Sequence, residues 1–148
     1  MAHDRFLEIW TYLHAINEKD GTTDKTDKIY KVRPILNTLL EKFRYCYLPK
    51  QFLNLDEGMI PTKNRFAIKQ YIKDKPIKFG IKSFILCEGD TGYIVASEIY
   101  TGKSDIEVQN LGVTGNVVLW LFKQGEASRK NHILVMDRYY NSVTLTKH

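Results

Sequence analysis

Two aspartates, Asp56 and Asp137, each follow an apolar stretch typical of a buried strand. The first stretch is "FLNL" at 52–55, and the second is "HILVM" at 132–136. Although the two aspartates are far apart in the chain, they can meet if their strands lie side by side in one sheet. Paired carboxylates at neighbouring strand ends form a hard-oxygen site for Mg²⁺ or Mn²⁺, which assists phosphoryl transfer. The spacing alone also allows the simpler alternative, in which each aspartate only ends a strand and caps a loop.

The residues beside these aspartates have expected roles of their own. Adjacent residues of a strand point to opposite faces, so Glu57 is expected to turn away from the site of Asp56. We expect Glu57 to form a local hydrogen bond or to pair with a nearby lysine. Tyr139 and Tyr140 are placed to touch a substrate, and Arg138 is placed to contact a phosphate or to pair with one of the aspartates.

A basic segment at 61–82 follows the first aspartate directly. It holds seven basic residues and one acid, a charge of +6 against +5 for the whole chain, so the remaining residues sum to −1. Basic clusters attract polyanions because neutralising phosphates releases counterions. A solvated basic face is the alternative. The candidate phosphate contacts are Lys63, Arg65, Lys69, Lys73, Lys75 and Lys78.

The elements that must position these residues are predicted from periodicity and turn signals. Helices are expected at 4–17, 29–46, 115–125 and from 141 onward, and strands at 52–59, 81–88, 93–100 and 132–137. Asp4 and either Asn141 or Ser142 are expected to cap helices, and Pro34 to lie in a first turn. The continuous apolar run at 132–137 predicts a strand buried on both faces. The order indicates an α/β fold, with helices packed on a mixed sheet.

Several classes of function are excluded by the sequence. No apolar run approaches the roughly 20 residues that a membrane span requires, and the start of the chain does not resemble a secretory signal. "DTG" at 90–92 suits the turn of a hairpin better than the catalytic loop of an aspartic protease. The histidines and the two cysteines have no metal-ligand spacing, and "LGVTGN" at 111–116 lacks the lysine of a P-loop.

Three stretches together resemble the piggyBac family of transposases and transposase-derived proteins. They are "NLDEGMIPTKNRFAIKQYIKDKPIKFGIK", "GYIVASEIYTGK" and "ILVMDRYYNSVTL". The resemblance implies an RNase H-like fold with a DDE/D active site, in which three aspartates bind two Mg²⁺ ions. By this resemblance Asp56 is the first aspartate and Asp137 is the second, and the reaction is DNA strand cleavage followed by transfer into TTAA targets.

The resemblance also implies how the chain is organised. Residues 1–50 would be a helical segment, part of a dimerisation and DNA-binding domain, and 51–148 the first part of the catalytic core. The family's third aspartate lies well downstream of the second, so we expect the core to be incomplete here. The family commonly has Asn where this sequence has Arg138.

The expected function is therefore a partial DDE/D transposase core with little or no transposition activity of its own. It would bind Mg²⁺ or Mn²⁺ weakly and contact DNA at transposon terminal repeats, with no membrane partner. A homodimer and a nuclear location are expected for the full-length protein. The alternatives are a domesticated, non-catalytic DNA-binding or interaction protein, and an RNase H-like nuclease.

Overall fold

The computed structural model describes residues 1–17, 24–73, 75–102, 111–128 and 130–147. The chain divides into two compact units, Met1–Leu39 and Leu40–His148. Helix α2, Arg33–Cys46, runs across the boundary between them. No helix in the described ranges combines the length and apolar character needed to cross a membrane.

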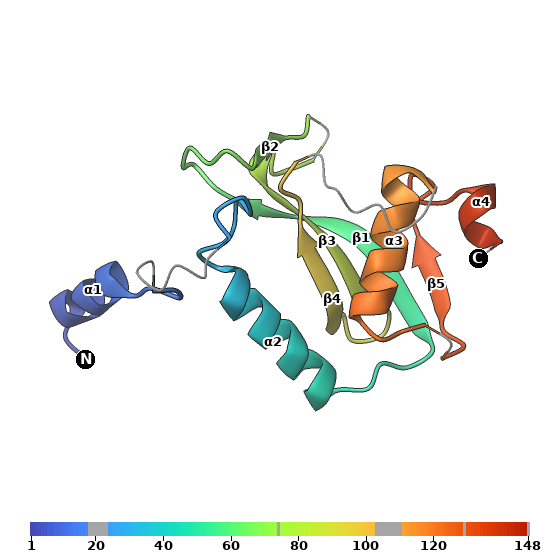
Figure 1. Cartoon of the computed structure of the whole chain (residues 1–148), viewed down its shortest axis with the longest axis horizontal. Coiled ribbons are helices and arrows are strands. Elements are labelled where there is room, and N and C mark those ends of the chain that lie inside the picture. Colours follow the sequence, from blue (N-terminus) through green and yellow to red (C-terminus); the bar gives the residue numbers. More distant parts are fainter. Residues whose placement is uncertain (18–23, 74, 103–110, 129, 148) are drawn as a thin grey trace. The chain divides into compact units, whose positions relative to one another are not determined.

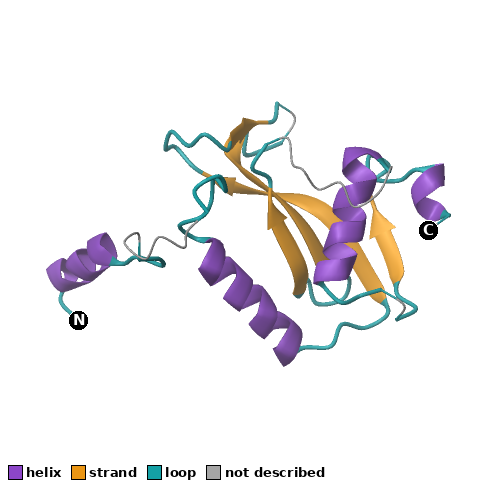
Figure 2. Cartoon of the chain, in the orientation of Figure 1, coloured by secondary structure: helices purple, strands orange, loops and turns teal. Residues whose placement is uncertain are grey.

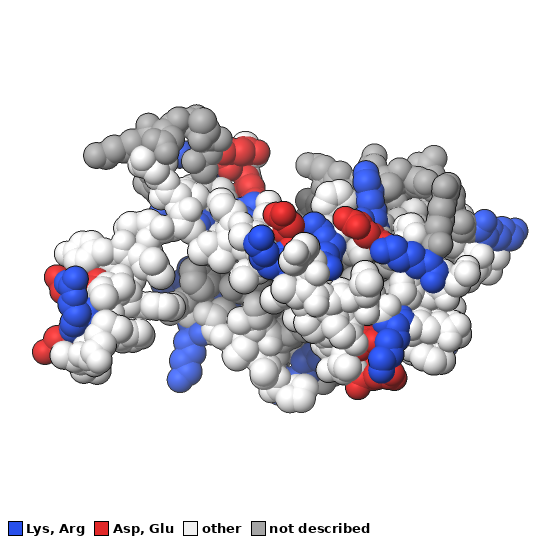
Figure 3. Space-filling model, turned by 90° about the horizontal axis from the view of Figure 1, so that it is seen from below, with Lys and Arg blue, Asp and Glu red and all other residues white. Residues whose placement is uncertain are grey.

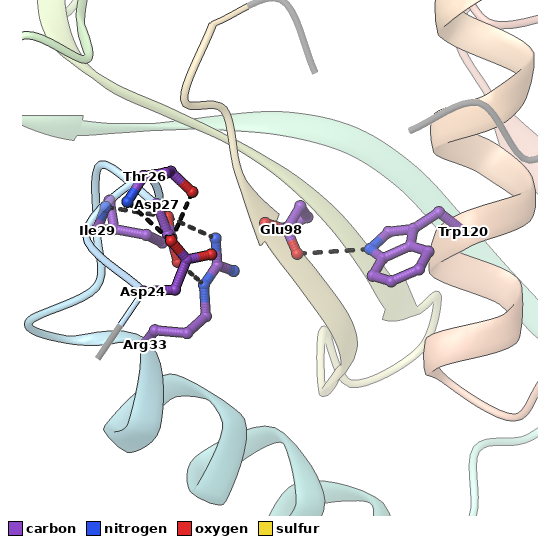
Figure 4. A network of polar contacts seen from close by, with 7 residues as sticks. All are labelled: Asp24, Thr26, Asp27, Ile29, Arg33, Glu98 and Trp120. Atoms are coloured by element: carbon purple, nitrogen blue, oxygen red, sulfur yellow. Dashed lines mark hydrogen bonds and ion pairs between the residues drawn. The ribbon is translucent and has the colours of Figure 1, made fainter. Parts of the chain in front are cut away.

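The first unit contains helix α1, His3–Tyr12, and the beginning of α2. None of the residues of α1 is buried, and the helix ends well before the predicted position 17. The predicted cap is wrong, because Ala2 is the N-cap and Asp4 lies inside the first turn. Arg33, the first residue of α2, donates to Asp27 at 2.7 Å (Figure 4), and this hydrogen bond holds the pKa of Asp27 below its ordinary value.

The second unit is built on a mixed sheet of five strands (Figures 1 and 2). The strands are β1 (Phe52–Pro61), β2 (Lys69–Tyr71), β3 (Phe79–Glu88), β4 (Ile94–Ile99) and β5 (Ile133–Met136). Their order is β2-β3-β1-β5, and β4 also pairs with β3. The β3–β4 hairpin that "GDTG" predicts is confirmed, with antiparallel pairing.

Helix α3, Gly112–Gln124, covers one face of the sheet (Figure 2). Leu53 and Leu55 of β1 and Leu86 of β3 point to this face, because alternate residues of a strand share a face. They pack against Val118 and Leu121 of α3. The indole N–H of Trp120 donates to Glu98 of β4 at 3.4 Å, which links the helix to the hairpin (Figure 4). This packing fixes the strand that carries Asp56.

A buried carboxylate fastens the chain just before β1. Glu88 is 1% exposed and accepts hydrogen bonds from the Tyr47 hydroxyl and the Lys50 N–H, each at 2.9 Å. The Thr91 hydroxyl also donates to it. The hydrogen bond from Thr91, followed by that from Lys50, holds the pKa of Glu88 below its ordinary value. The segment leading into β1 is therefore anchored to the β3–β4 turn.

Helix α4, Val143–Thr146, follows β5 after a short turn. The Ser142 hydroxyl accepts the Leu145 N–H at 3.1 Å, so Ser142 is the cap, one of the two that the sequence predicts. Pro34 lies in the first turn of α2, and Gly125 ends α3, both as predicted.

Three sequence predictions about strands are wrong or incomplete. Strand β1 ends at Pro61, two residues beyond the predicted 59, because β3 pairs with it along its whole second half. Strand β5 is half exposed rather than buried on both faces, with Ile133 at 45% and Val135 at 55%. The short strand β2 was not predicted, since its residues, Lys-Gln-Tyr, show no strand pattern.

Candidate metal centre

The register of the sheet places Asp56 and Asp137 at neighbouring positions. Strands β1 and β5 are parallel, and their paired residues run from Phe52 with Ile133 to Leu55 with Met136. Asp56 and Asp137 are the next residue on each strand. Neighbouring strands lie about 4.8 Å apart, so the two aspartates start from adjacent points of the sheet. The sheet thus brings together the two residues that the sequence singles out.

Both aspartates are exposed, and each uses one carboxylate oxygen locally. Asp56 Oδ1 accepts the Glu57 N–H at 2.7 Å, and Asp137 Oδ1 accepts the Tyr139 N–H at 3.3 Å. Among the residues that the structure describes, neither carboxylate forms an ion pair with Lys or Arg. Two uncompensated carboxylates side by side are a donor set that suits a hard divalent cation.

The site faces away from α3. Leu53 and Leu55 point into the core, so Asp56 points to the opposite face, with Asn54. Cys87 is paired with Asn54 and lies near Asp56. The pKa of the Cys87 thiol is raised first by burial and then by the negative charge of Asp56.

Glu57 is held on the core side by two partners. The Tyr140 hydroxyl donates to Glu57 Oε2 at 2.6 Å, and Lys75 Nζ lies 3.9 Å from Glu57 Oε1. The prediction that Glu57 bonds locally or pairs with a lysine is therefore confirmed. Burial, followed by the hydrogen bond to Glu57, raises the pKa of Tyr140.

The two tyrosines after Asp137 differ in their surroundings. Tyr140 is 1% exposed and packs edge-on against Phe84, so the prediction that it touches a substrate is wrong. Tyr139 is 66% exposed, and Lys82 Nζ lies 6.0 Å from its ring centroid. Arg138 is exposed, and its predicted pairing with an aspartate is not found in the described part of the chain.

The basic segment flanks β2 and leads into β3. Four of its candidate phosphate contacts are exposed: Lys63, Arg65, Lys73 and Lys78. Lys69 turns inward, where Nζ bonds to the carbonyls of Lys63 and Asn64 at 3.4 and 3.3 Å and lies over the Phe79 ring. With Lys75 paired to Glu57, the exposed charge of the segment comes from the four outward residues.

The face of the molecule in Figure 3 has a mixed charge. Basic side chains lie next to acidic ones there, among a majority of uncharged residues.

The described residues contain no group of three or more His, Cys, Asp or Glu side chains that can hold one metal ion. The candidate centre therefore consists of two carboxylates. Glu98, a possible third ligand, lies on β4, which β3 separates from β1, and Trp120 donates to it.

Sequence reasoning missed two contributions to the surroundings of the site. Lys82 lies 4.9 Å from the Phe84 ring centroid, beside Tyr139, but the sequence shows it only as one more basic residue. The Tyr140–Glu57 hydrogen bond spans 83 positions, so no local pattern reveals it. The sequence cue for this contact was the presence of Tyr140 three positions after Asp137.

Comparisons with known proteins show what the chain is similar to. The family profile described as Transposase IS4 matches residues 1–148. The human PiggyBac transposable element-derived protein 3 is 31% identical over 149 residues, which span 98% of this chain and 24% of that protein. The human Chimeric ERCC6-PGBD3 protein is also 31% identical over 149 residues, spanning 98% of this chain and 14% of its own length.

A solved structure agrees with the sequence comparisons. The cryo-EM structure of a piggyBac transposase synaptic complex with hairpin DNA matches with a TM-score of 0.83 and 26% identity. The match covers 99% of this chain and 30% of the solved chain. The similarity therefore extends over nearly all of this sequence, but over less than a third of each of these proteins.

Proposed function

The chain belongs to the IS4/piggyBac family of transposases and carries part of its RNase H-like core, and from this premise we propose that it contributes to a metal-dependent site for DNA strand cleavage and transfer. The observation that carries the proposal is the parallel register of β1 and β5, whose last pair, Leu55 with Met136, directly precedes Asp56 and Asp137. Exposed carboxylates at neighbouring strand ends, without Lys or Arg partners in the described part of the chain, are the kind of oxygen donor that a divalent cation binds.

Asp56 and Asp137 would hold the cation, Mg²⁺ or Mn²⁺. When bound, the cation would supply Lewis-acid stabilisation of charge on phosphate oxygens. Both carboxylates are exposed, and neither has a lysine or arginine partner in the described part of the chain. Two carboxylates are few for a hard cation, so we expect weak binding and little or no transposition by these 148 residues.

DNA is the proposed partner, by analogy with the piggyBac complex, which contains hairpin DNA. Lys63, Arg65, Lys73 and Lys78 supply the exposed positive charge for phosphates, and Arg138 adds one beside Asp137. Lys69 and Lys75, which have partners within the chain, would contribute less. Terminal-repeat recognition, TTAA targets, a homodimer and a nuclear location belong to this proposal for the full-length protein.

The DNA part of the proposal is tested by the salt dependence of binding. Each phosphate contact contributes roughly 0.9 to the slope of log K against log salt concentration. Replacing all four exposed residues with Ala should therefore reduce the slope by up to about 3.6 in fluorescence anisotropy with a terminal-repeat duplex. The replaced residues are Lys63, Arg65, Lys73 and Lys78.

A matched control removes four exposed lysines elsewhere and gives the same net charge. These are Lys25, Lys42, Lys123 and Lys147. The control should keep most of the slope. Equal losses in both variants would show that net charge alone drives binding, and the assigned contacts would be wrong.

The chemical part of the proposal is tested by nicking of the same duplex with Mn²⁺. Cleavage that is lost with Asp56→Ala supports a metal-dependent site. Binding that persists without any cleavage favours a non-catalytic DNA-binding protein, the alternative suggested by a relative described as transposable element-derived. Cleavage of unrelated duplexes at the same rate favours a general nuclease.

A further inference from the structure

The ladder between β1 and β5 stops one residue before the two aspartates. The last pair is Leu55 with Met136. Beyond it, β1 continues beside β3, while the chain after β5 turns away. Backbone pairing therefore does not hold Asp137 at the level of Asp56, and another contact must do so if the two are to share a ligand.

Asp137 opens a tight turn that Tyr140 closes. The Tyr140 N–H donates to the Asp137 carbonyl at 3.0 Å. The Tyr140 side chain then enters the core, where it is 1% exposed and its ring lies edge-on, 6.2 Å from that of Phe84. The position of the Asp137 turn is thus tied to the position of one buried side chain.

The hydroxyl of that side chain reaches the neighbour of Asp56. It donates to Glu57 Oε2 at 2.6 Å, and Glu57 is also 3.9 Å from Lys75. The phenol O–H is the donor in this bond, because a carboxylate oxygen accepts. A hydrogen bond to a charged acceptor is stronger than one between neutral groups. It joins the turn of Asp137 to the residue next to Asp56.

We propose that Tyr140 and Glu57 are positioning residues, which together hold the Asp137 carboxylate beside Asp56. Glu57 is then an anchor on the core side of β1 and not a ligand of the cation. The inference rests on the proposed function, because it assumes that Asp56 and Asp137 bind a divalent cation.

The test measures Mn²⁺ affinity of the 148-residue chain by electron paramagnetic resonance, with urea unfolding of each variant in parallel. Tyr140→Phe removes the hydroxyl and keeps the ring, and it should weaken Mn²⁺ binding roughly 10-fold, as loss of outer partners of metal ligands does. Glu57→Gln keeps an oxygen that accepts from Tyr140, and it should remain within about threefold of the unmodified chain.

Tyr100→Phe is the matched control, since Tyr100 also lies edge-on to Phe84, at 6.0 Å. It should leave Mn²⁺ affinity unchanged. In a Glu57→Ala background, Tyr140→Phe should cost no further affinity, because the hydroxyl has then lost its acceptor. Independent losses in the double variant would overturn the inference.

Hydrogen exchange of the Tyr140 amide, without metal, gives a second readout. Tyr140→Phe should speed this exchange in a chain that remains folded. This inference alone is overturned if the unmodified chain binds Mn²⁺ at Asp56 and Asp137 but Tyr140→Phe changes neither the Mn²⁺ affinity nor the rate of amide exchange. If Glu57→Gln loses as much Mn²⁺ affinity as Asp56→Asn, Glu57 is itself a ligand, and this inference is also overturned. If the unmodified chain does not bind Mn²⁺ through these aspartates, the proposed function fails as well.

Discussion

Replacing Asp56 with Asn should stabilise the metal-free chain. Asp56 and Asp137 directly follow Leu55 and Met136, the last pair of β1 and β5, and strand spacing separates their starting points by roughly 5 Å. Two like charges at about 5 Å in water repel by about 0.8 kcal/mol. The value for water applies because both side chains are exposed. Asn keeps the oxygen that accepts the Glu57 N–H, so the charge is the main thing lost.

The assay is urea unfolding at low ionic strength, followed by the fluorescence of Trp120 in the second unit. In EDTA, Asp56→Asn should raise the free energy of unfolding by about 0.5–1 kcal/mol. With Mn²⁺, the unmodified chain should gain stability by mass action and the variant should gain much less. Screening predicts that the difference in EDTA shrinks at high salt.

Asp90→Asn is the matched control, because it removes the same charge from an exposed residue that pairs with Lys50 at 3.2 Å. It should leave stability unchanged or lower it by less than about 1 kcal/mol, without altering the response to Mn²⁺. The reasoning is refuted if Asp56→Asn destabilises the chain in EDTA. It is equally refuted if the variant keeps the full stabilisation by Mn²⁺.

Three further predictions concern the fold that positions the site. Leu121→Ala, at a 0% exposed position of α3, should lower the free energy of unfolding by about 2–5 kcal/mol; a loss below about 1 kcal/mol would contradict the assigned core. Gly80→Ala would place a Cβ 2.5 Å from the Ile60 carbonyl oxygen, so it should separate β1 from β3 locally and cost about 1–3 kcal/mol; unchanged amide exchange along β1 would argue against that contact. The pKa of Glu88 is lowered in the folded chain, so ionised Glu88 adds stability at pH values above its ordinary pKa of 4.5. That stability is lost as the pH falls through the pKa of Glu88 in the folded state. Glu88→Gln should therefore melt lower than the unmodified chain at pH 7, and the gap should narrow in acid; a gap independent of pH would count against this anchor.

The sequence predicted those parts of the fold for which the signal is local. The β3–β4 hairpin followed from two β-favouring runs around "GDTG", and the cap of α4, Ser142, was one of the two residues predicted, with Asn141. The helix at 4–17 was overextended, since an amphipathic pattern does not show where tertiary support ends. Strand β1 runs two residues beyond the predicted 59, because its end depends on pairing with β3.

The same distinction applies to the candidate site. Asp56 and Asp137 were recognisable because each follows an apolar run, and the sheet order then made them neighbours. The role of Tyr140 was not recognisable, because its burial and its bond to Glu57 depend on how the turn after β5 packs on β1. The inward position of Lys69 is a similar case, since its carbonyl partners come from a loop with no regular pattern.

The central claim is that Asp56 and Asp137 bind one divalent cation together. The most direct measurement is paramagnetic broadening of amide signals by substoichiometric Mn²⁺ in the 148-residue chain. The account predicts that the amides of Glu57 and Tyr139, which donate to the two carboxylates, broaden first and in parallel, and that either Asp56→Asn or Asp137→Asn removes both effects. Broadening centred elsewhere, or confined to one of the two amides, would contradict a shared site.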